Sequence, residues 1–216
     1  LNANNFFIKK IEEKTIFRKP RAPFNTSTLQ QTANSQLNFS ASQTMTIAQG
    51  LYMGVDINKE TTALITYMRT DSLTLSKDSI DILRENIQKN YGDKYLPKAP
   101  VEYKSKKKNA QEAHEAIRPT DISIKPDEIK EFLSEEQFKL YDLIWKRTIA
   151  SQMTDAKFDR TTVKINLSNT EEHFVAKGEV ITFEGFMKVY LEGKDDNNDE
   201  QEGVLPKIEE GDKLVI

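Results

Sequence analysis

The sequence predicts an α+β fold in which a helical block is inserted between two strand-rich segments. Three observations support this prediction. The first 25 residues mix apolar and charged side chains as strands do, the middle of the chain contains several apolar runs with helical spacing, and the apolar period changes to two after Asp155. We therefore expect a helical domain at 26–154 and a discontinuous β-rich domain made of 1–25 and 155–216.

The N-terminal elements are expected to be strands followed by a helix. Residues 6–18 alternate Phe and Ile with charges and predict one or two strands. The proline-containing stretch 19–23 ends them, because each proline disfavours helix at the residue before it. A helix then begins in the run of hydroxyl residues at 26–28, any of which can cap it, and continues to Leu37.

Three further helices are expected in the middle of the chain. Apolar residues at helical spacing predict them over 42–54, 76–90 and 134–153. Ser134 and Gln137 form the pattern of a capping box at the start of the last helix.

The C-terminal part is expected to be β-structure. Alternation over 163–167 indicates a half-buried antiparallel strand, and 173–183 and 186–191 predict two more. The acidic stretch 192–202 contains no apolar residue and predicts a solvated loop. A turn then precedes a further strand that begins near 213.

Composition excludes several classes of protein. The 31 Lys and Arg residues nearly balance 34 Asp and Glu, giving a net charge of -3, so there is no global positive field for a polyanion. Zero Cys excludes disulfides, thiolate zinc sites and Cys nucleophiles, and with only two His we expect no metal site in this chain. Apolar runs are too short to cross a bilayer, and no leader pattern is present, so we expect no membrane partner and a cytoplasmic location.

The segment 64–72 is the first candidate site. If the chain is extended there, Tyr67, Arg69 and Asp71 lie on one face. A phenol beside a guanidinium suits phosphoryl chemistry, because Arg matches phosphate oxygens and a Tyr oxygen can act as a covalent nucleophile. The alternative is a buried Tyr at a strand end, with the Arg and Asp paired at the surface.

Two other segments are candidates for phosphate contacts. If 109–118 is helical, His114 and Arg118 lie on one face, although a surface helix explains them as well. The basic patch Lys104–Lys108 precedes them and is either solvated or in contact with a nucleic-acid backbone. Thr26, Ser27 and Thr28 could hold an anion at a helix N-terminus, and capping alone explains them equally well.

Together these segments resemble the bacterial type IA DNA topoisomerases. The family has a Pro-Phe-x-Thr-Ser-Thr-Leu-Gln-Gln stretch, matched at 23–31, and an Ile-Thr-Tyr-x-Arg-Thr-Asp-Ser stretch around its DNA-cleaving tyrosine, matched at 65–72. It also has a His-Glu-Ala-Ile-Arg-Pro stretch, matched at 114–119. The resemblance covers about 20–191.

The resemblance implies roles for single residues. Tyr67 attacks a single-stranded DNA phosphodiester and holds the 5′ phosphate as a phosphotyrosine, and Arg69 positions the scissile phosphate. Weaker implications concern DNA contacts by six residues: His114, Arg118, Asp71, Thr26, Ser27 and Thr28.

The resemblance also implies what accompanies this chain. The helical domain would be winged-helix-like, and the strand-rich segments would form a hinged β-arch. We expect the chain to be a central piece of a longer protein, inactive alone. An acidic N-terminal domain of the same protein would bind Mg²⁺, and the intact enzyme, associated with the nucleoid, would relax negatively supercoiled DNA without ATP.

Two other classes of function remain open from the sequence. One is a non-catalytic winged-helix DNA-binding module that uses Lys104–Lys108 and Arg118 for phosphates. The other is a purely structural helical domain in which Tyr67 is a core residue.

Overall fold

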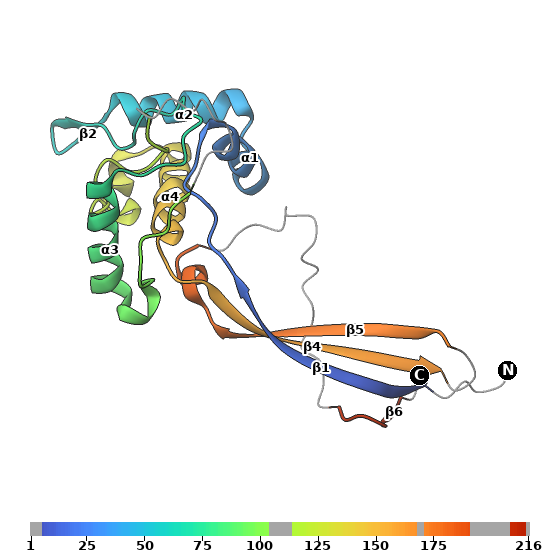
Figure 1. The fold of residues 1–216 in the computed structure, drawn as a ribbon. Helices are drawn as coiled ribbons and strands as arrows, with labels where there is room; N and C mark the ends of the chain where they lie inside the picture. Colours follow the sequence, from blue (N-terminus) through green and yellow to red (C-terminus); the bar gives the residue numbers. More distant parts are fainter. Residues whose placement is uncertain (1–5, 104–113, 168–170, 191–207, 215–216) are drawn as a thin grey trace. The chain divides into compact units, whose positions relative to one another are not determined.

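The computed structural model describes residues 6–103, 114–167, 171–190 and 208–214 (Figure 1). The chain divides into two compact units, which are considered separately. One unit contains four strands of an antiparallel sheet, and the other contains the four α-helices. The structure therefore confirms the α+β fold class.

The sheet unit is built on three long strands in the order β5-β4-β1, with the short β6 at the other edge. The strands are β1 (Phe6–Arg18), β4 (Ala156–Leu167), β5 (His173–Phe183) and β6 (Lys213–Leu214). The two strand-rich segments expected at the ends of the chain thus pair directly. Strand β1 runs antiparallel to β4, from Phe6 opposite Leu167 to Arg18 opposite Ala156. This pairing joins segments about 150 residues apart.

A charged cluster links the three long strands of this sheet. Glu179 on β5 accepts a hydrogen bond from Arg18 on β1 at 2.9 Å and another from Arg160 on β4 at 2.6 Å. The Arg18 guanidinium also lies 4.3 Å from the ring centre of Phe158. Because one carboxylate binds arginines from two strands, it fixes their register through charge-assisted hydrogen bonds.

The helical unit contains all the candidate site residues. Its main elements are α1 (Thr26–Leu37), α2 (Ala41–Met53), the hairpin β2 (Val55–Ile57) and β3 (Glu60–Thr62), α3 (Lys77–Tyr91) and α4 (Glu135–Ser151). Short 3₁₀ turns are η1 (Asp93–Tyr95), η2 (Pro126–Glu128), η3 (Lys130–Phe132) and η4 (Gly185–Lys188). The four helices confirm those expected from the apolar spacing.

Helix α4 is the centre of the helical unit, and it packs against α1 and α2. Its capping box is present as expected, with Ser134 accepting from the Gln137 backbone and Gln137 accepting from the Ser134 backbone. Three of its buried side chains hold the surrounding loops. Trp145 and Tyr141 donate to carbonyls of the 122–124 segment. Arg147 lies between two aromatic rings, one of them Phe24.

The expected strand at 186–191 is wrong. Gly185–Lys188 is a 3₁₀ turn, and Phe186 and Tyr190 are buried in the helical unit. The Tyr190 hydroxyl accepts a hydrogen bond from Arg147 at 3.0 Å. Apolar residues in this stretch therefore serve the helical core. Residues 19–25, which the sequence placed with the strands, also belong to the helical unit.

Candidate active site

Residues 64–72 form an irregular segment between β3 and α3, and their side chains alternate between surface and interior. Tyr67, Arg69 and Asp71 are exposed, whereas Met68 between the first two is 1% exposed. The backbone bends in this segment and forms no strand, yet the alternation still leaves all three polar side chains accessible to solvent. Since Tyr67 is 46% exposed, the hypothesis that it is a core residue is wrong.

The residue before the tyrosine is fixed by the segment at 114–119. The Thr66 backbone N–H donates to the Arg118 carbonyl at 2.9 Å, and the Thr66 hydroxyl donates to the Ala116 carbonyl at 2.7 Å. The same hydroxyl accepts from the Arg118 N–H at 3.0 Å. An isolated bridge between Ile65 and Pro119 extends this pairing. These bonds leave little freedom for the backbone immediately before Tyr67.

The residues after the tyrosine are fixed by the start of α1. The Thr26 N–H donates to the Thr70 carbonyl at 3.0 Å, and the Thr70 N–H donates to the Thr26 hydroxyl at 2.9 Å. That hydroxyl donates to the Met68 carbonyl at 2.8 Å. A further bond from Ile117 N–H to the Phe24 carbonyl at 2.7 Å joins the other two motifs. The three sequence motifs thus converge on one loop.

Two candidates for phosphate contacts are exposed on the surface. Arg69 and His114 are both exposed, and neither side chain has a hydrogen bond or ion pair among the described residues. The Arg69 guanidinium therefore keeps its donors for a ligand, and a fork of donors suits phosphate oxygens. Asp71 is exposed on the same segment.

The expected helix through His114 and Arg118 is wrong. Residues 114–119 are non-helical, with single bridges at Ile117 and Pro119. Their backbone groups pair with the chain near 24 and 65, and a helix would have used those groups internally. Spacing of four residues therefore does not put His114 and Arg118 on one helical face.

Arg118 is directed into the protein. Its guanidinium donates to a Glu115 carboxylate oxygen at 2.6 and 2.9 Å and to the Pro119 carbonyl at 2.8 Å. Glu115 also accepts from the Ser76 N–H, at the start of α3, at 3.0 Å. Partial burial disfavours the Glu115 carboxylate, but the Ser76 hydrogen bonds and the Arg118 charge outweigh it and lower the pKa of Glu115 below its usual 4.5.

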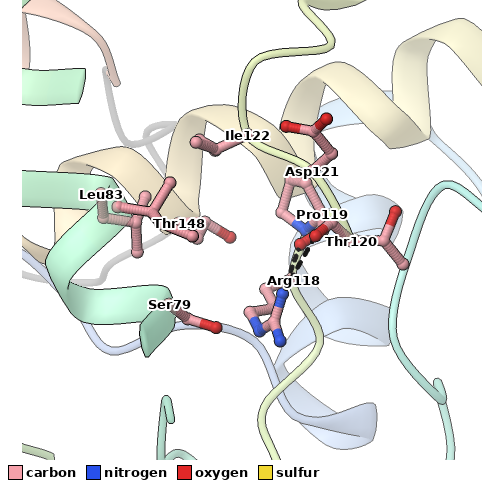
Figure 2. A pocket seen from close by; sticks show the side chains of 9 residues that line it. Ser79, Leu83, Arg118, Pro119, Thr120, Asp121, Ile122 and Thr148 are labelled. Atoms are coloured by element: carbon pink, nitrogen blue, oxygen red, sulfur yellow. Dashed lines mark hydrogen bonds between the residues drawn. The ribbon is translucent and has the colours of Figure 1, made fainter. Parts of the chain in front are cut away.

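A pocket of about 350 Å³ lies beside this segment (Figure 2). Figure 2 shows Arg118 next to Pro119 and Thr120, with Ser79 and Leu83 of α3 and Thr148 of α4 facing the same space. Neither Tyr67 nor Arg69 is among its lining residues. The candidate nucleophile therefore lies outside this pocket.

The hydroxyl run at the start of α1 has divided roles. The cap of α1 is Asn25, whose side chain accepts from the Thr28 N–H at 2.9 Å, while the Thr28 hydroxyl accepts from the Asn25 N–H at 3.0 Å. The expectation that one of the three hydroxyl residues is the cap is therefore wrong. Thr26 holds the tyrosine loop, and Ser27 is exposed.

Other expectations concern the remaining surface. Within the described ranges, no group of three or more His, Asp or Glu side chains is placed to hold a metal ion. That an acidic N-terminal domain of the same protein binds Mg²⁺, as the family resemblance implies, stays a prediction. The expected basic patch Lys104–Lys108 and the expected acidic loop 192–202 lie outside the described residues.

In the portion that is described, no helix combines the length and apolarity that a membrane crossing requires.

Comparison with known proteins agrees with this arrangement. The DNA topoisomerase family matches residues 1–216, and the chain belongs to that family. This confirms the resemblance to the bacterial type IA DNA topoisomerases that the three motifs indicated.

Individual relatives are also similar over the whole chain. DNA topoisomerase 1 of Rickettsia felis is 54% identical over 214 residues, which cover 99% of this chain and 28% of the relative. DNA topoisomerase 1 of Rickettsia bellii is 53% identical over 214 residues, and this chain covers 27% of its length. Full-length topoisomerase I from Thermotoga maritima superposes with a TM-score of 0.82 at 34% identity, covering 99% of this chain and 33% of that one. The chain thus spans less than a third of these relatives.

Some residues of the site have no role predicted from the sequence. Thr66 and Glu115 lie inside the motifs, but only the fold shows that they join the motifs to one another and to α3. Tyr52, whose ring contacts that of Tyr67, was expected only as an apolar position of a helix. Its partner across the loop lies 15 residues further along, and no local spacing rule relates the two.

Proposed function

We propose that this chain provides the DNA-cleaving tyrosine of a type IA DNA topoisomerase. The observation that carries the proposal is the position of Tyr67: its phenol is exposed on a loop whose backbone is held on both sides by the two other motifs. A nucleophile that must meet a polymeric substrate needs access, and one that must attack in line needs a fixed backbone. Tyr67 has both.

The reaction proposed is a reversible transesterification of single-stranded DNA. The Tyr67 oxygen forms a bond to phosphorus while the bond from phosphorus to the 3′ oxygen breaks. The phenol loses its proton, and the leaving 3′ oxygen gains one. The 5′ phosphate stays on the tyrosine as an ester, so the reverse attack by the 3′-hydroxyl reseals the strand without a nucleotide cofactor.

Arg69 is proposed to stabilise this reaction. Its guanidinium is exposed on the same segment and has no partner among the described side chains, so it can donate to the non-bridging phosphate oxygens as charge develops on them. His114, also exposed, is proposed to contact a neighbouring backbone phosphate. In the complete enzyme this activity relaxes negatively supercoiled DNA, with Mg²⁺ bound by residues other than those described here.

The roles of Thr26 and Arg118 are proposed to be structural rather than direct DNA contacts. The Thr26 hydroxyl and the Arg118 guanidinium already bind groups of the protein. This weakens the alternative of a non-catalytic DNA-binding module, which relied on Arg118 for phosphates.

The test uses a full-length chimera in which this chain replaces the matching 214 residues of the Rickettsia felis relative. The chimera is incubated with a 3′-end-labelled single-stranded oligonucleotide, and covalent adducts are separated in denaturant. We expect an adduct from the chimera and none from its Tyr67→Phe variant, with non-covalent binding unchanged because only the phenol oxygen is removed. Tyr91→Phe, which changes a half-buried phenol on α3, is the matched control.

Two results would contradict the proposal. One is a denaturant-stable adduct with the Tyr67→Phe chimera. The other is the lack of any adduct with the unsubstituted chimera under conditions in which the Rickettsia protein itself forms one.

A further inference from the structure

The end of helix α2 lies against the segment that carries Tyr67. The Leu64 N–H donates to the Leu51 carbonyl in the last turn of the helix at 2.9 Å. The hairpin β2–β3 connects the two and begins after Gly54, the C-cap residue of α2, where φ is 113° and a Cβ atom would lie 2.7 Å from the Thr61 methyl. Only glycine is accommodated there without a shift, and the close return keeps α2 beside the loop.

This arrangement brings the rings of Tyr52 and Tyr67 together. Their centroids are 5.4 Å apart and their planes are inclined by 63°, an edge-to-face contact. Both values lie in the range that aromatic pairs prefer. Tyr52 belongs to the last turn of α2, a regular and well-packed element whose neighbour Leu51 is fully buried.

The hydrogen bonds of the loop do not set the orientation of the Tyr67 side chain. The backbone bonds of Thr66, Met68 and Thr70 fix where the side chain begins, but they do not fix its torsion angles. Among the described residues, the Tyr67 hydroxyl makes no hydrogen bond that would do so. Because nearly half of the side chain faces solvent, few other contacts restrict it.

We propose that Tyr52 is a positioning residue for the nucleophile: its ring holds the Tyr67 ring in the orientation from which the phenol oxygen attacks phosphorus. This inference rests on the proposed function of Tyr67. It predicts that the aromatic ring of Tyr52 matters and that its hydroxyl does not. It also predicts an effect on the rate of attack and not on DNA affinity, because Tyr52 orients a protein group and does not hold the substrate.

The experiment measures single-turnover adduct formation by the full-length chimera over a range of concentrations of a single-stranded oligonucleotide. This gives a maximal rate and a half-saturating concentration. Tyr52→Phe retains the ring, Tyr52→Leu removes it while keeping an apolar side chain, and Tyr52→Met is a second ring-free variant with an adaptable side chain. Tyr91→Leu is the matched control, since Tyr91 forms a similar edge-to-face pair with Tyr95, at 6.4 Å and 65°, on the far end of α3.

We expect both ring-free variants to lower the maximal rate roughly tenfold and to leave the half-saturating concentration within about twofold. Tyr52→Phe and Tyr91→Leu should keep the rate. A melting curve on each variant confirms that the compared proteins are folded. Where Tyr52→Leu does not fold, Tyr52→Met decides.

Three outcomes would overturn the inference. Unchanged rates in the ring-free variants would show that the contact does not position the nucleophile. A rate as low in Tyr52→Phe would assign the effect to the hydroxyl, and a raised half-saturating concentration at constant rate would make Tyr52 a DNA contact. If Tyr67→Phe itself forms adducts, the proposed function fails, which is a separate and distinguishable result.

Discussion

Single hydroxyl groups determine how the candidate nucleophile is held. Thr26 and Thr66 each use one side-chain oxygen both to donate and to accept, so each closes a small hydrogen-bonded ring around the tyrosine loop. A valine at either position would have the same shape and leave backbone groups of the loop without partners, which is costly when those groups are buried. The hydrogen bonds to the backbone therefore explain why a hydroxyl residue stands at both positions.

Arg69 is the residue whose chemistry is most open to test. In the full-length chimera, Arg69→Ala should slow DNA cleavage by roughly 10²–10³, as loss of a transition-state donor does in other enzymes. The Arg69→Lys variant should keep only part of the rate, because the point charge of lysine lacks the planar fork of donors. The measurement is the single-turnover rate of adduct formation. Equal rates for Arg, Lys and Ala would show that Arg69 is an ordinary surface residue.

At the scale of elements, the sequence predicted the regular parts well and the irregular ones poorly. Helix α4 was predictable because its capping residues and its apolar spacing agree, and β4 was predictable from strict alternation. Residues 114–119 were predicted as a helix from local spacing. They are extended because their partners at 24 and 65 are distant in sequence, and such pairing overrides local preference.

The same limit applies to the site. Tyr67 and Arg69 could be selected from residue chemistry and motif resemblance, and the exposure of both agrees with that choice. The inward direction of Arg118 could not be predicted, because it arises in a segment that pairs with the distant residues 24 and 65 and is not helical. The contact between Tyr52 and Tyr67 joins the end of α2 to the tyrosine loop, and no local spacing rule predicts it.

The connection between α3 and the 114–119 segment should depend on pH. Because the folded state lowers the pKa of Glu115, its carboxylate stabilises the fold above the unfolded pKa near 4.5, and this contribution is lost as pH falls through the lower folded value. Glu115→Gln should therefore reduce the free energy of unfolding at pH 7, and the difference from the unsubstituted chain should shrink below pH 4.5.

Urea unfolding of the two proteins between pH 7 and pH 3 provides the measurement. Glu135→Gln is a suitable control, since the Glu135 carboxylate pairs with Lys139 on the exposed surface of α4 and should matter less. If the free energy of unfolding differs between the unsubstituted chain and Glu115→Gln by the same amount over this whole pH range, the lowered pKa of Glu115 is contradicted.

At the scale of the molecule, the chain spans 28% of the Rickettsia felis relative and includes the tyrosine loop as a folded structure. A folded nucleophile does not by itself make a complete active site. In the described residues the Tyr67 hydroxyl has no hydrogen-bonded base, and no cluster of three metal ligands is found. We therefore expect activation of the Tyr67 phenol to depend on further groups of the longer protein.

It follows that the 216-residue chain alone should fold and should not relax supercoiled DNA. With a net charge of -3, its binding to DNA should also be weak and should fall steeply as salt is added. A plasmid relaxation assay with Mg²⁺ checks the lack of relaxation, and a thermal melt of the same preparation checks that the chain is folded. Full relaxation by the isolated chain would mean that the catalytic groups are complete within it.

The most direct test of the central claim is to locate the covalent bond. The adduct formed by the full-length chimera is digested with nuclease and trypsin, and the modified peptide is identified by mass spectrometry. Tyr67 is the sole tyrosine of the tryptic peptide 60–69, whereas Tyr52 lies on the preceding peptide 22–59. We expect the nucleotide remnant on 60–69, with fragmentation assigning it to Tyr67. A remnant on Tyr52, or on any other residue, would contradict the account.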